Sequence, residues 1–227
     1  MTQQIGADMG HGHGHAADDE FHFTQEYWDD RYRSADHLWS GQPNHQLVAQ
    51  VEGLAPGAAL DAGCGEGADA IWLAARGWTV TAVDVSAVAL DRAAEHAAAL
   101  GDEVAERISW QRQDLLVWEP EADRFDLVSA QFIHVPGDKL TSLHRRLSAA
   151  VRPGGTLLVV GHHPDDLHVN VGRPDTLGLF PSAEELAGTL DPDRWEILVA
   201  TAAGRAGKDL DGQPVTLTDT VLRARRR

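Results

Sequence analysis

Apolar and polar positions alternate along the chain in blocks, and seven short apolar runs rich in β-formers predict strands. They lie within residues 58–63, 78–84, 107–114, 124–131, 155–162, 194–201 and 214–224. Most of the intervening segments have helical spacing. Strands that alternate with helices predict parallel βαβ units with right-handed crossovers, and hence an α/β fold with a doubly wound sheet covered by helices on both faces.

Local signals at the ends of these helical segments support the assignment. One helix is expected over residues 68–76, and a second begins after the N-cap Ser86 and ends at Gly101. A third covers about residues 138–151 and ends before Pro153, where two glycines suit a tight turn. Ser182 and Glu185 form a capping box, so a further helix begins there.

The last two predicted strands are connected differently. Residues 203–213 between them are too polar and too rich in glycine for a crossover helix. Antiparallel strands need only a short connection, so these two are expected to form a hairpin at the edge of the sheet.

The chain ahead of the sheet divides into two parts. Residues 1–20 contain few large apolar groups and predict a disordered tail rich in histidine and glycine. Residues 21–53 contain two short helical patterns and predict a helical cap. Residues 54–227 are expected to form a single domain together with this cap.

Composition excludes several classes of partner. The chain has 19 basic and 35 acidic residues, a formal net charge of −16, which argues against general binding to nucleic acid or to an anionic membrane. Cys64 is the only cysteine, so no intramolecular disulfide is possible. No apolar stretch approaches a membrane span, and the first residues do not resemble a secretory leader. We expect a soluble, cytoplasmic protein; the oligomeric state stays open.

Candidate chemistry begins at "LDAGCGEGAD", residues 60–69, where Gly63, Gly65 and Gly67 follow Asp61. In a doubly wound sheet the first strand delivers such a loop to the ligand site. The pattern also satisfies the fingerprint for dinucleotides, with Asp84 at the distance of a ribose-binding acid. The loop by itself therefore leaves a dinucleotide and a positively charged cofactor open.

Charge separates these two interpretations. A pyrophosphate would meet Asp61, Glu66 and Asp69 within one turn, whereas the ammonium and sulfonium of S-adenosylmethionine would be attracted. Asp84 ends the second predicted strand and Asp114 the third, where carboxylates can accept from ribose hydroxyls and from an adenine amino group. Because dinucleotide enzymes need no acid at the third strand, S-adenosylmethionine is favoured over NAD.

These motifs, with "FDLVSAQF" and "VRPGGTLLV", resemble the class I S-adenosylmethionine-dependent methyltransferases over roughly residues 24–227. Within that family, "YWDDRYRSADHLWSGQPN" resembles the cap of the small-molecule branch that includes tellurite-resistance and thiopurine methyltransferases. The resemblance implies a methyltransferase domain over residues 54–227. It also implies a set of cofactor-binding residues: Asp61, Gly63, Gly65 and Gly67 at the methionine end, Asp84 and Val85 at the ribose, Asp114 and Leu115 at the adenine, Gln131 beside the methyl donor, and Trp39 in the lid.

Methyl transfer mainly requires a nucleophile held in line with the methyl group. A thiolate or chalcogen oxyanion needs only positioning, whereas an alcohol or amine needs a base, for which His134 is the candidate. Histidines also occur in "HGHGH" (residues 11–15) and in "HHPDDLH" (residues 162–168), but glycine spacing and loop composition are more typical of solvated side chains, so no metal site is predicted.

The sequence predicts a methyltransferase that acts on a small molecule such as a thiol or chalcogen oxyanion. The alternatives left open are a non-catalytic sensor that binds S-adenosylmethionine or a metal, and an NAD-dependent oxidoreductase.

Overall fold

The computed structural model describes residues 24–133, 135, 137–173 and 178–227. The predicted tail of residues 1–20, with its HGHGH segment, and the candidate base His134 lie outside the described residues. The division into tail, cap and domain stays a prediction.

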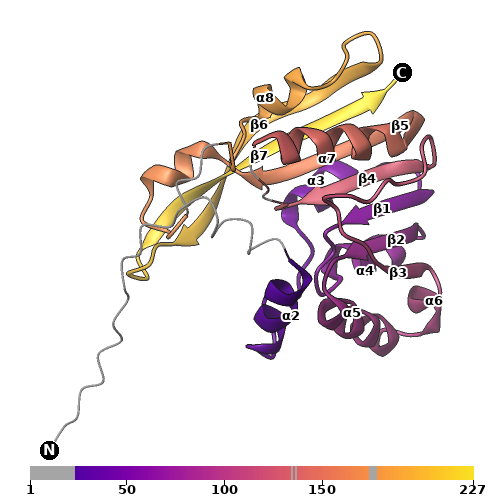
Figure 1. The fold of residues 1–227 in the computed structure, drawn as a ribbon, viewed down its shortest axis with the longest axis horizontal. Coiled ribbons are helices and arrows are strands. Elements are labelled where there is room, and N and C mark those ends of the chain that lie inside the picture. Colours follow the sequence, from indigo (N-terminus) through magenta and orange to yellow (C-terminus); the bar gives the residue numbers. More distant parts are fainter. Residues whose placement is uncertain (1–23, 134, 136, 174–177) are drawn as a thin grey trace, which may run out of the picture.

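The described chain forms a seven-stranded sheet with the order β3-β2-β1-β4-β5-β7-β6 (Figure 1). The neighbours among β3, β2, β1, β4 and β5 are parallel, whereas β7 runs antiparallel to both β5 and β6. This confirms the predicted fold class, including the C-terminal antiparallel hairpin. The strands are β1 (Ala58–Ala62), β2 (Thr79–Asp84), β3 (Ile108–Arg112), β4 (Phe125–Gln131), β5 (Val151–His162), β6 (Trp195–Lys208) and β7 (Pro214–Arg226).

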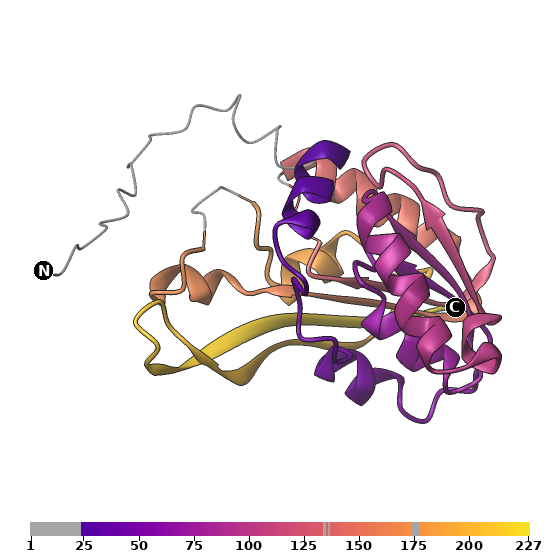
Figure 2. The ribbon, with the colours of Figure 1, turned by 90° about the horizontal axis from the view of Figure 1, so that it is seen from below.

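Helices cover both faces of the sheet, as the alternation of strands and helices predicts. The bounds are α2 (Gln25–Arg33), α3 (His45–Val51), α4 (Ala68–Ala74), α5 (Ala87–Ala99), α6 (Asp102–Ala105), α7 (Gly137–Ala150), η2 (Pro164–His168) and α8 (Ala183–Gly188). Apolar residues of α3, α4 and α5 share one core cluster, and those of α7 and α8 share the other. Figure 2 shows the sheet nearly edge-on between these layers.

The predicted local signals are present at several helix ends. Ser86 caps α5 by accepting from the N–H of Ala89, and Gly101 follows the helix with a positive φ of 113°. Ser182 and Glu185 form the expected capping box of α8. These short-range hydrogen bonds depend on neighbouring residues alone, which is why the sequence indicates them.

Two boundaries differ from the prediction. Strand β5 begins at Val151, so the predicted turn at Pro153 is part of the strand, where a register shift against β4 makes room for Gly154 at a φ of 82°. Strand β6 continues to Lys208 through a segment predicted to be a loop. Its pairing with β7 outweighs the weak β-propensity of the alanines and glycines.

The hairpin extends beyond the rest of the sheet. Pairing of β5 with β7 reaches the His162–Asp219 pair, whereas pairing of β6 with β7 continues to Lys208 and Pro214. We call residues 204–208 and 214–218 the ribbon; Figure 1 shows it projecting past the other strands. The loop of residues 163–172 lies against it, because His163 N donates to Thr218 O at 3.0 Å and Leu210 N to Asn170 O at 2.8 Å.

Among the described residues, no helix is both long enough and apolar enough to cross a bilayer.

Candidate functional site

Strand register brings the predicted site residues to one edge of the sheet. Asp61 lies opposite Ala82 of β2 and Ser129 of β4, so the residues that follow are level with each other. Gly63 therefore lies beside Asp84 at the end of β2 and Gln131 at the end of β4. This edge holds the carboxyl ends of the parallel strands, where ligands bind in such folds.

The backbone of the glycine loop is fixed by hydrogen bonds to β2. Gly63 N and Cys64 N both donate to Val83 O, at 2.8 and 3.0 Å, and Gly65 N donates to Asp84 Oδ2 at 2.9 Å. The glycines at positions 63, 65 and 67 have φ values of 70°, 52° and 85°, which L side chains rarely adopt.

The three glycines face different neighbours. A Cβ at Gly65 would lie 2.9 Å from the hydroxyl of Tyr32, so its lack of a side chain lets the cap approach the loop. A Cβ at Gly67 would lie 2.6 Å from the ring of Trp110, so this third glycine is required for packing of the loop against β3. The spacing in the sequence does not distinguish these two roles.

Asp61 is the most unusual acid of the site. Its side chain is buried, one carboxylate oxygen has no hydrogen-bond partner, and the N–H of Ala70 donates to the carboxylate. Burial, with repulsion from Asp69 and Asp84, raises the pKa of Asp61 well above its usual value. A cation at this oxygen would offset the cost of burying the carboxylate charge and would reduce its repulsion by Asp69 and Asp84.

Asp84 is buried as well but has more partners. It accepts from Gly65 N and Ser86 N, both at 2.9 Å. Burial raises the pKa of Asp84, and these backbone N–H groups oppose the rise. Asp84 therefore ends β2 in a fixed orientation at the carboxyl edge.

The acids at positions 66 and 69 of the loop hold the cap. The carboxylate of Glu66 accepts from Leu38 N and Trp39 N at 3.2 and 3.3 Å and pairs with Arg92 at 2.9 Å. Asp69 accepts from Asn44 N at 2.6 Å, and burial raises the pKa of Asp69 to about 6. Glu66 is thus neutralised by the protein itself, which leaves Asp61 as the main acid available to a ligand.

The predicted lid residue lies over the glycine loop. Trp39 donates from Nε1 to the Tyr32 hydroxyl at 3.1 Å, and this nitrogen would lie 3.5 Å from a Cβ at Gly65. Trp39 is 52% exposed, whereas Tyr32 is buried. Burial, with the charge of Asp84, raises the pKa of Tyr32, so its hydroxyl stays protonated.

The remaining predicted residues are less constrained. Asp114 is exposed, two positions beyond the end of β3, and accepts from Leu116 N at 2.8 Å. The carbonyl of Leu115 accepts from Arg146 at 2.6 Å. Gln131 donates to Ser129 at 2.8 Å, and its buried Oε1 has no hydrogen-bond partner. Val85 follows Asp84 and donates its N–H to that carboxylate.

The sequence interpretation missed three buried acids. Asp29 of α2 accepts from the hydroxyl of Ser86, Asp166 is fully buried although its loop was expected to be solvated, and Asp219 of β7 is fully buried as well. For Asp29 the available signal was an acid at the buried position of an amphipathic helix. For Asp166 no sequence signal exists, because its burial depends on the ribbon.

In the described part of the chain, no group of three or more His, Cys, Asp and Glu side chains is arranged to hold a metal ion. In the HHPDDLH segment, His163 caps η2 by accepting from Asp165 N at 3.2 Å.

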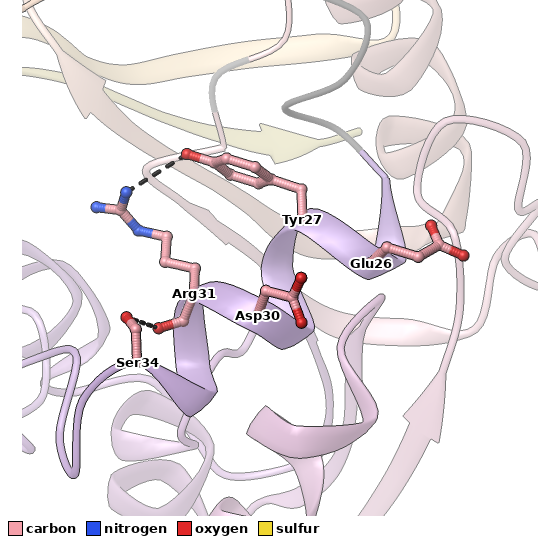
Figure 3. A pocket seen from close by; sticks show the side chains of 5 residues that line it. All are labelled: Glu26, Tyr27, Asp30, Arg31 and Ser34. Carbon is pink, nitrogen blue, oxygen red and sulfur yellow. Dashed lines mark hydrogen bonds between the residues drawn. The ribbon is translucent and has the colours of Figure 1, made fainter.

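A surface hollow of about 380 Å³ lies on α2, lined by Glu26, Tyr27, Asp30, Arg31 and Ser34 (Figure 3). Arg31 donates to the hydroxyl of Tyr27 at 3.4 Å across this hollow. Because these residues occupy the side of α2 away from Asp29, the hollow and the glycine loop lie on different sides of the helix.

Comparison with known proteins agrees with this geometry. Residues 59–155, which include the glycine loop, Asp84, Asp114 and Gln131, match the family model of a methyltransferase domain. This segment, 97 of the 227 residues, is a methyltransferase domain. S-adenosylmethionine is its cofactor, and the buried, partnerless oxygen of Asp61 suits the ammonium group of that cofactor.

One curated protein and two solved structures show what the chain is similar to. A ubiquinone biosynthesis O-methyltransferase from Coxiella burnetii is 34% identical over 100 residues, which are 43% of this chain and 40% of that one. A solved structure from work on converting a disulfide bond into a thioacetal group in echinomycin biosynthesis has a TM-score of 0.70 and 26% identity, covering 89% of this chain and 92% of that one. TehB from Haemophilus influenzae has a TM-score of 0.65 and 18% identity, with coverages of 89% and 67%.

The chain spans about two fifths of the length of the first of these relatives. The family model matches residues 59–155, which hold the glycine loop and Asp84, and the similar proteins have different names. The match therefore identifies the domain and its cofactor rather than the acceptor.

Proposed function

We propose that this protein transfers the methyl group of S-adenosylmethionine to a small-molecule acceptor. The observation that carries the proposal is Asp61, a buried carboxylate with one oxygen lacking a hydrogen-bond partner, placed beside two more acids. A pyrophosphate would add negative charge there, whereas an ammonium group removes the repulsion.

Most of the predicted residues have a role that their position supports. Asp61 binds the ammonium, the backbone of residues 63 and 65 approaches the cofactor closely, and Asp84 accepts from the ribose hydroxyls. Asp114 and Leu115 border the adenine, Gln131 lies at the end of the neighbouring strand, and Trp39 covers the loop. When bound, the cofactor supplies an electrophilic methyl group; the protein holds the acceptor in line and excludes water.

We keep a small acceptor with a soft nucleophile as the proposed substrate class. A thiolate or chalcogen oxyanion needs positioning and no general base. One structural relative is named for chemistry at sulfur, and another relative is named for O-methylation. For an O-acceptor, His134 is our candidate base.

Calorimetry tests the cofactor. We expect S-adenosylmethionine and its demethylated product to bind, and NAD not to bind. Asp84→Ala should weaken the binding of S-adenosylmethionine by ~1.5–3 kcal/mol, the range for a hydrogen bond to a charged group. Asp91→Ala on the exposed side of α5 is the matched control. Tight binding of NAD without S-adenosylmethionine would disprove the proposal.

Transfer itself is tested by incubating labelled S-adenosylmethionine with thiols, halides, selenite, tellurite and small phenols. Turnover with a thiol or chalcogen oxyanion that survives His134→Ala would support a base-free mechanism. Turnover confined to phenols and lost in that variant would assign His134 as the base instead.

A further inference from the structure

Helix α2 contacts the cofactor edge through one buried acid. Asp29 is 6% exposed, and its Oδ1 accepts from the hydroxyl of Ser86 at 2.6 Å and from Val88 N at 3.4 Å. Its other oxygen accepts from Gln25 at 3.1 Å and lies 3.8 Å from Arg33. The cap is therefore tied to the turn between β2 and α5, which lies 57 residues further along the chain.

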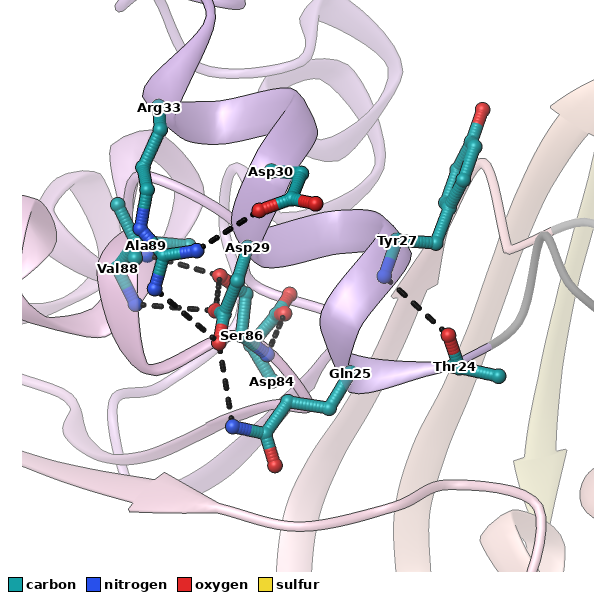
Figure 4. A network of polar contacts seen from close by, with 10 residues as sticks. All are labelled: Thr24, Gln25, Tyr27, Asp29, Asp30, Arg33, Asp84, Ser86, Val88 and Ala89. Atoms are coloured by element: carbon teal, nitrogen blue, oxygen red, sulfur yellow. Dashed lines mark hydrogen bonds and ion pairs between the residues drawn. The ribbon is translucent and has the colours of Figure 1, made fainter.

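Ser86 connects this acid to the acid that ends β2. Its N–H donates to Asp84 Oδ1 at 2.9 Å, and its hydroxyl oxygen accepts from Ala89 N at 3.2 Å as the N-cap of α5. Figure 4 shows the resulting path from α2 through Asp29 and Ser86 to Asp84. The second oxygen of Asp84 accepts from Gly65 N, so the path continues into the glycine loop.

The charge of Asp29 gives this path its strength. Burial opposes ionisation, but hydrogen bonds from Ser86, Gln25 and Val88 outweigh burial and lower the pKa of Asp29. A hydroxyl that donates to an ionised carboxylate forms a short, strong hydrogen bond. The hydroxyl of Ser86 donates its hydrogen to Asp29, so the hydroxyl oxygen is oriented to accept from Ala89 N of α5. The backbone N–H of Ser86 donates to Asp84.

We propose that Asp29 is a positioning residue of the cofactor site, which fixes Asp84 through Ser86 and makes binding of S-adenosylmethionine depend on a docked α2. This inference rests on the proposed function. It adds that the cap, which lies outside the matched methyltransferase segment, contributes to cofactor affinity. By thermodynamic linkage, bound cofactor in turn stabilises the docked helix.

Calorimetric titration of S-adenosylmethionine into three variants tests the role of the acid. Asp29→Ala should weaken binding about tenfold, and Asp29→Asn, which keeps an acceptor oxygen for Ser86 but has no charge, should restore only part of the affinity. Asp30→Ala is the matched control, because Asp30 is the next residue of the same helix but is exposed and pairs only with Arg33 among the described residues.

A double-mutant cycle tests the path itself. Ser86→Ala removes the donor to Asp29, so in the Asp29→Ala background it should cost less affinity than in the otherwise unchanged chain. In the Asp30→Ala background it should cost the full amount. Equal costs in both backgrounds would contradict the path.

Hydrogen exchange of the unmodified protein tests whether bound S-adenosylmethionine stabilises the docked α2. Amides of α2 (residues 25–33) and of residues 86–89 should exchange more slowly when S-adenosylmethionine is added, whereas those of α8 (residues 183–188) should not change. The inference alone would be overturned if the unmodified chain binds S-adenosylmethionine, the exchange of α2 does not change, and Asp29→Ala binds as tightly as the unmodified chain. Absence of any binding to the unmodified chain would overturn the proposed function and the inference with it.

Discussion

Two parts of the molecule, the glycine loop and the ribbon, contain buried acids, and these acids have different surroundings. At the glycine loop, Asp61 is affected by Asp69 and Asp84, and no basic side chain of the described residues pairs with it. Beside the ribbon, Asp219 is fully buried, accepts from Arg205 Nε at 2.9 Å and lies 3.7 Å from His45 Nε2.

The ribbon cluster differs from the glycine loop in having arginines beside its acids, although Asp166 Oδ2 and Asp219 Oδ2, like Asp61 Oδ2, have no hydrogen-bond partner. Burial lowers the pKa of Arg173, and the nearby carboxylates of Asp166 and Asp219 oppose that effect. Asp166 also accepts from Thr218 N at 2.8 Å. Acids and arginines there hold the loop of residues 163–172 on the ribbon. We therefore propose the buried acids without cations for the ligand site, whereas acids paired with arginine hold a structural contact.

The largest expected effect comes from removing the arginine of the ribbon cluster. Arg205→Ala leaves the buried carboxylate of Asp219 without its cation and should lower the free energy of unfolding by about 3 kcal/mol. Arg225→Ala is the control, because Arg225 pairs with Glu196 on the exposed part of the same hairpin and should cost under ~1 kcal/mol. Urea denaturation measures both. Equal losses would remove the contrast between buried and exposed pairs.

The acids at the glycine loop should make the stability of the protein fall as the pH rises. The pKa of Asp69 in the folded state, about 6, is raised above its ordinary value of 3.8, so its contribution to stability is complete below pH 3.8 and is lost as the pH rises through about 6. Without cofactor, the free energy of unfolding should fall by on the order of 2 kcal/mol over this range. Denaturation at several pH values measures this loss.

Asp69→Asn is the variant that checks the assignment. The asparagine keeps an acceptor for Asn44 N but has no charge to titrate, so the fall in stability between pH 4 and 6 should become smaller. If the variant and the unmodified chain lose the same stability, the titrating group lies elsewhere.

The smallest effect on stability is expected for Asp61→Asn, and its sign should be favourable. The asparagine keeps an oxygen for the N–H of Ala70 and removes a buried charge repelled by Asp69 and Asp84, so the chain should gain about 1 kcal/mol. Binding of S-adenosylmethionine should weaken in the same variant, because its ammonium loses a partner. A variant that is both less stable and unchanged in affinity would show that Asp61 is structural.

The glycine loop was readable from sequence because its determinants are local. Strand ends, glycines at residues 63 and 65 and the acids at 61 and 84 are set by short segments, and parallel register then brings them to one edge. Asp114 follows the same rule but is exposed, so the structure constrains it less than the sequence pattern suggests.

The roles of other loop residues could not be predicted in this way. Glu66 was counted among the charges facing a ligand, yet its carboxylate accepts from Leu38 and Trp39 and pairs with Arg92. Gly67 was grouped with the ligand-facing glycines, but a side chain there would collide with Trp110. In each case the deciding partner is at least 26 residues away in the chain.

The sequence by itself determined the strand and helix order, the hairpin at the edge, the capping residues and the edge that carries the predicted cofactor residues. Periodicity and capping depend on residues that are near each other in the chain. The tertiary structure decided which acids are already satisfied, how far the ribbon extends and that Asp29 reaches Ser86. Those outcomes depend on burial and on contacts between distant segments, and the free energy of a buried charge is set by what surrounds it.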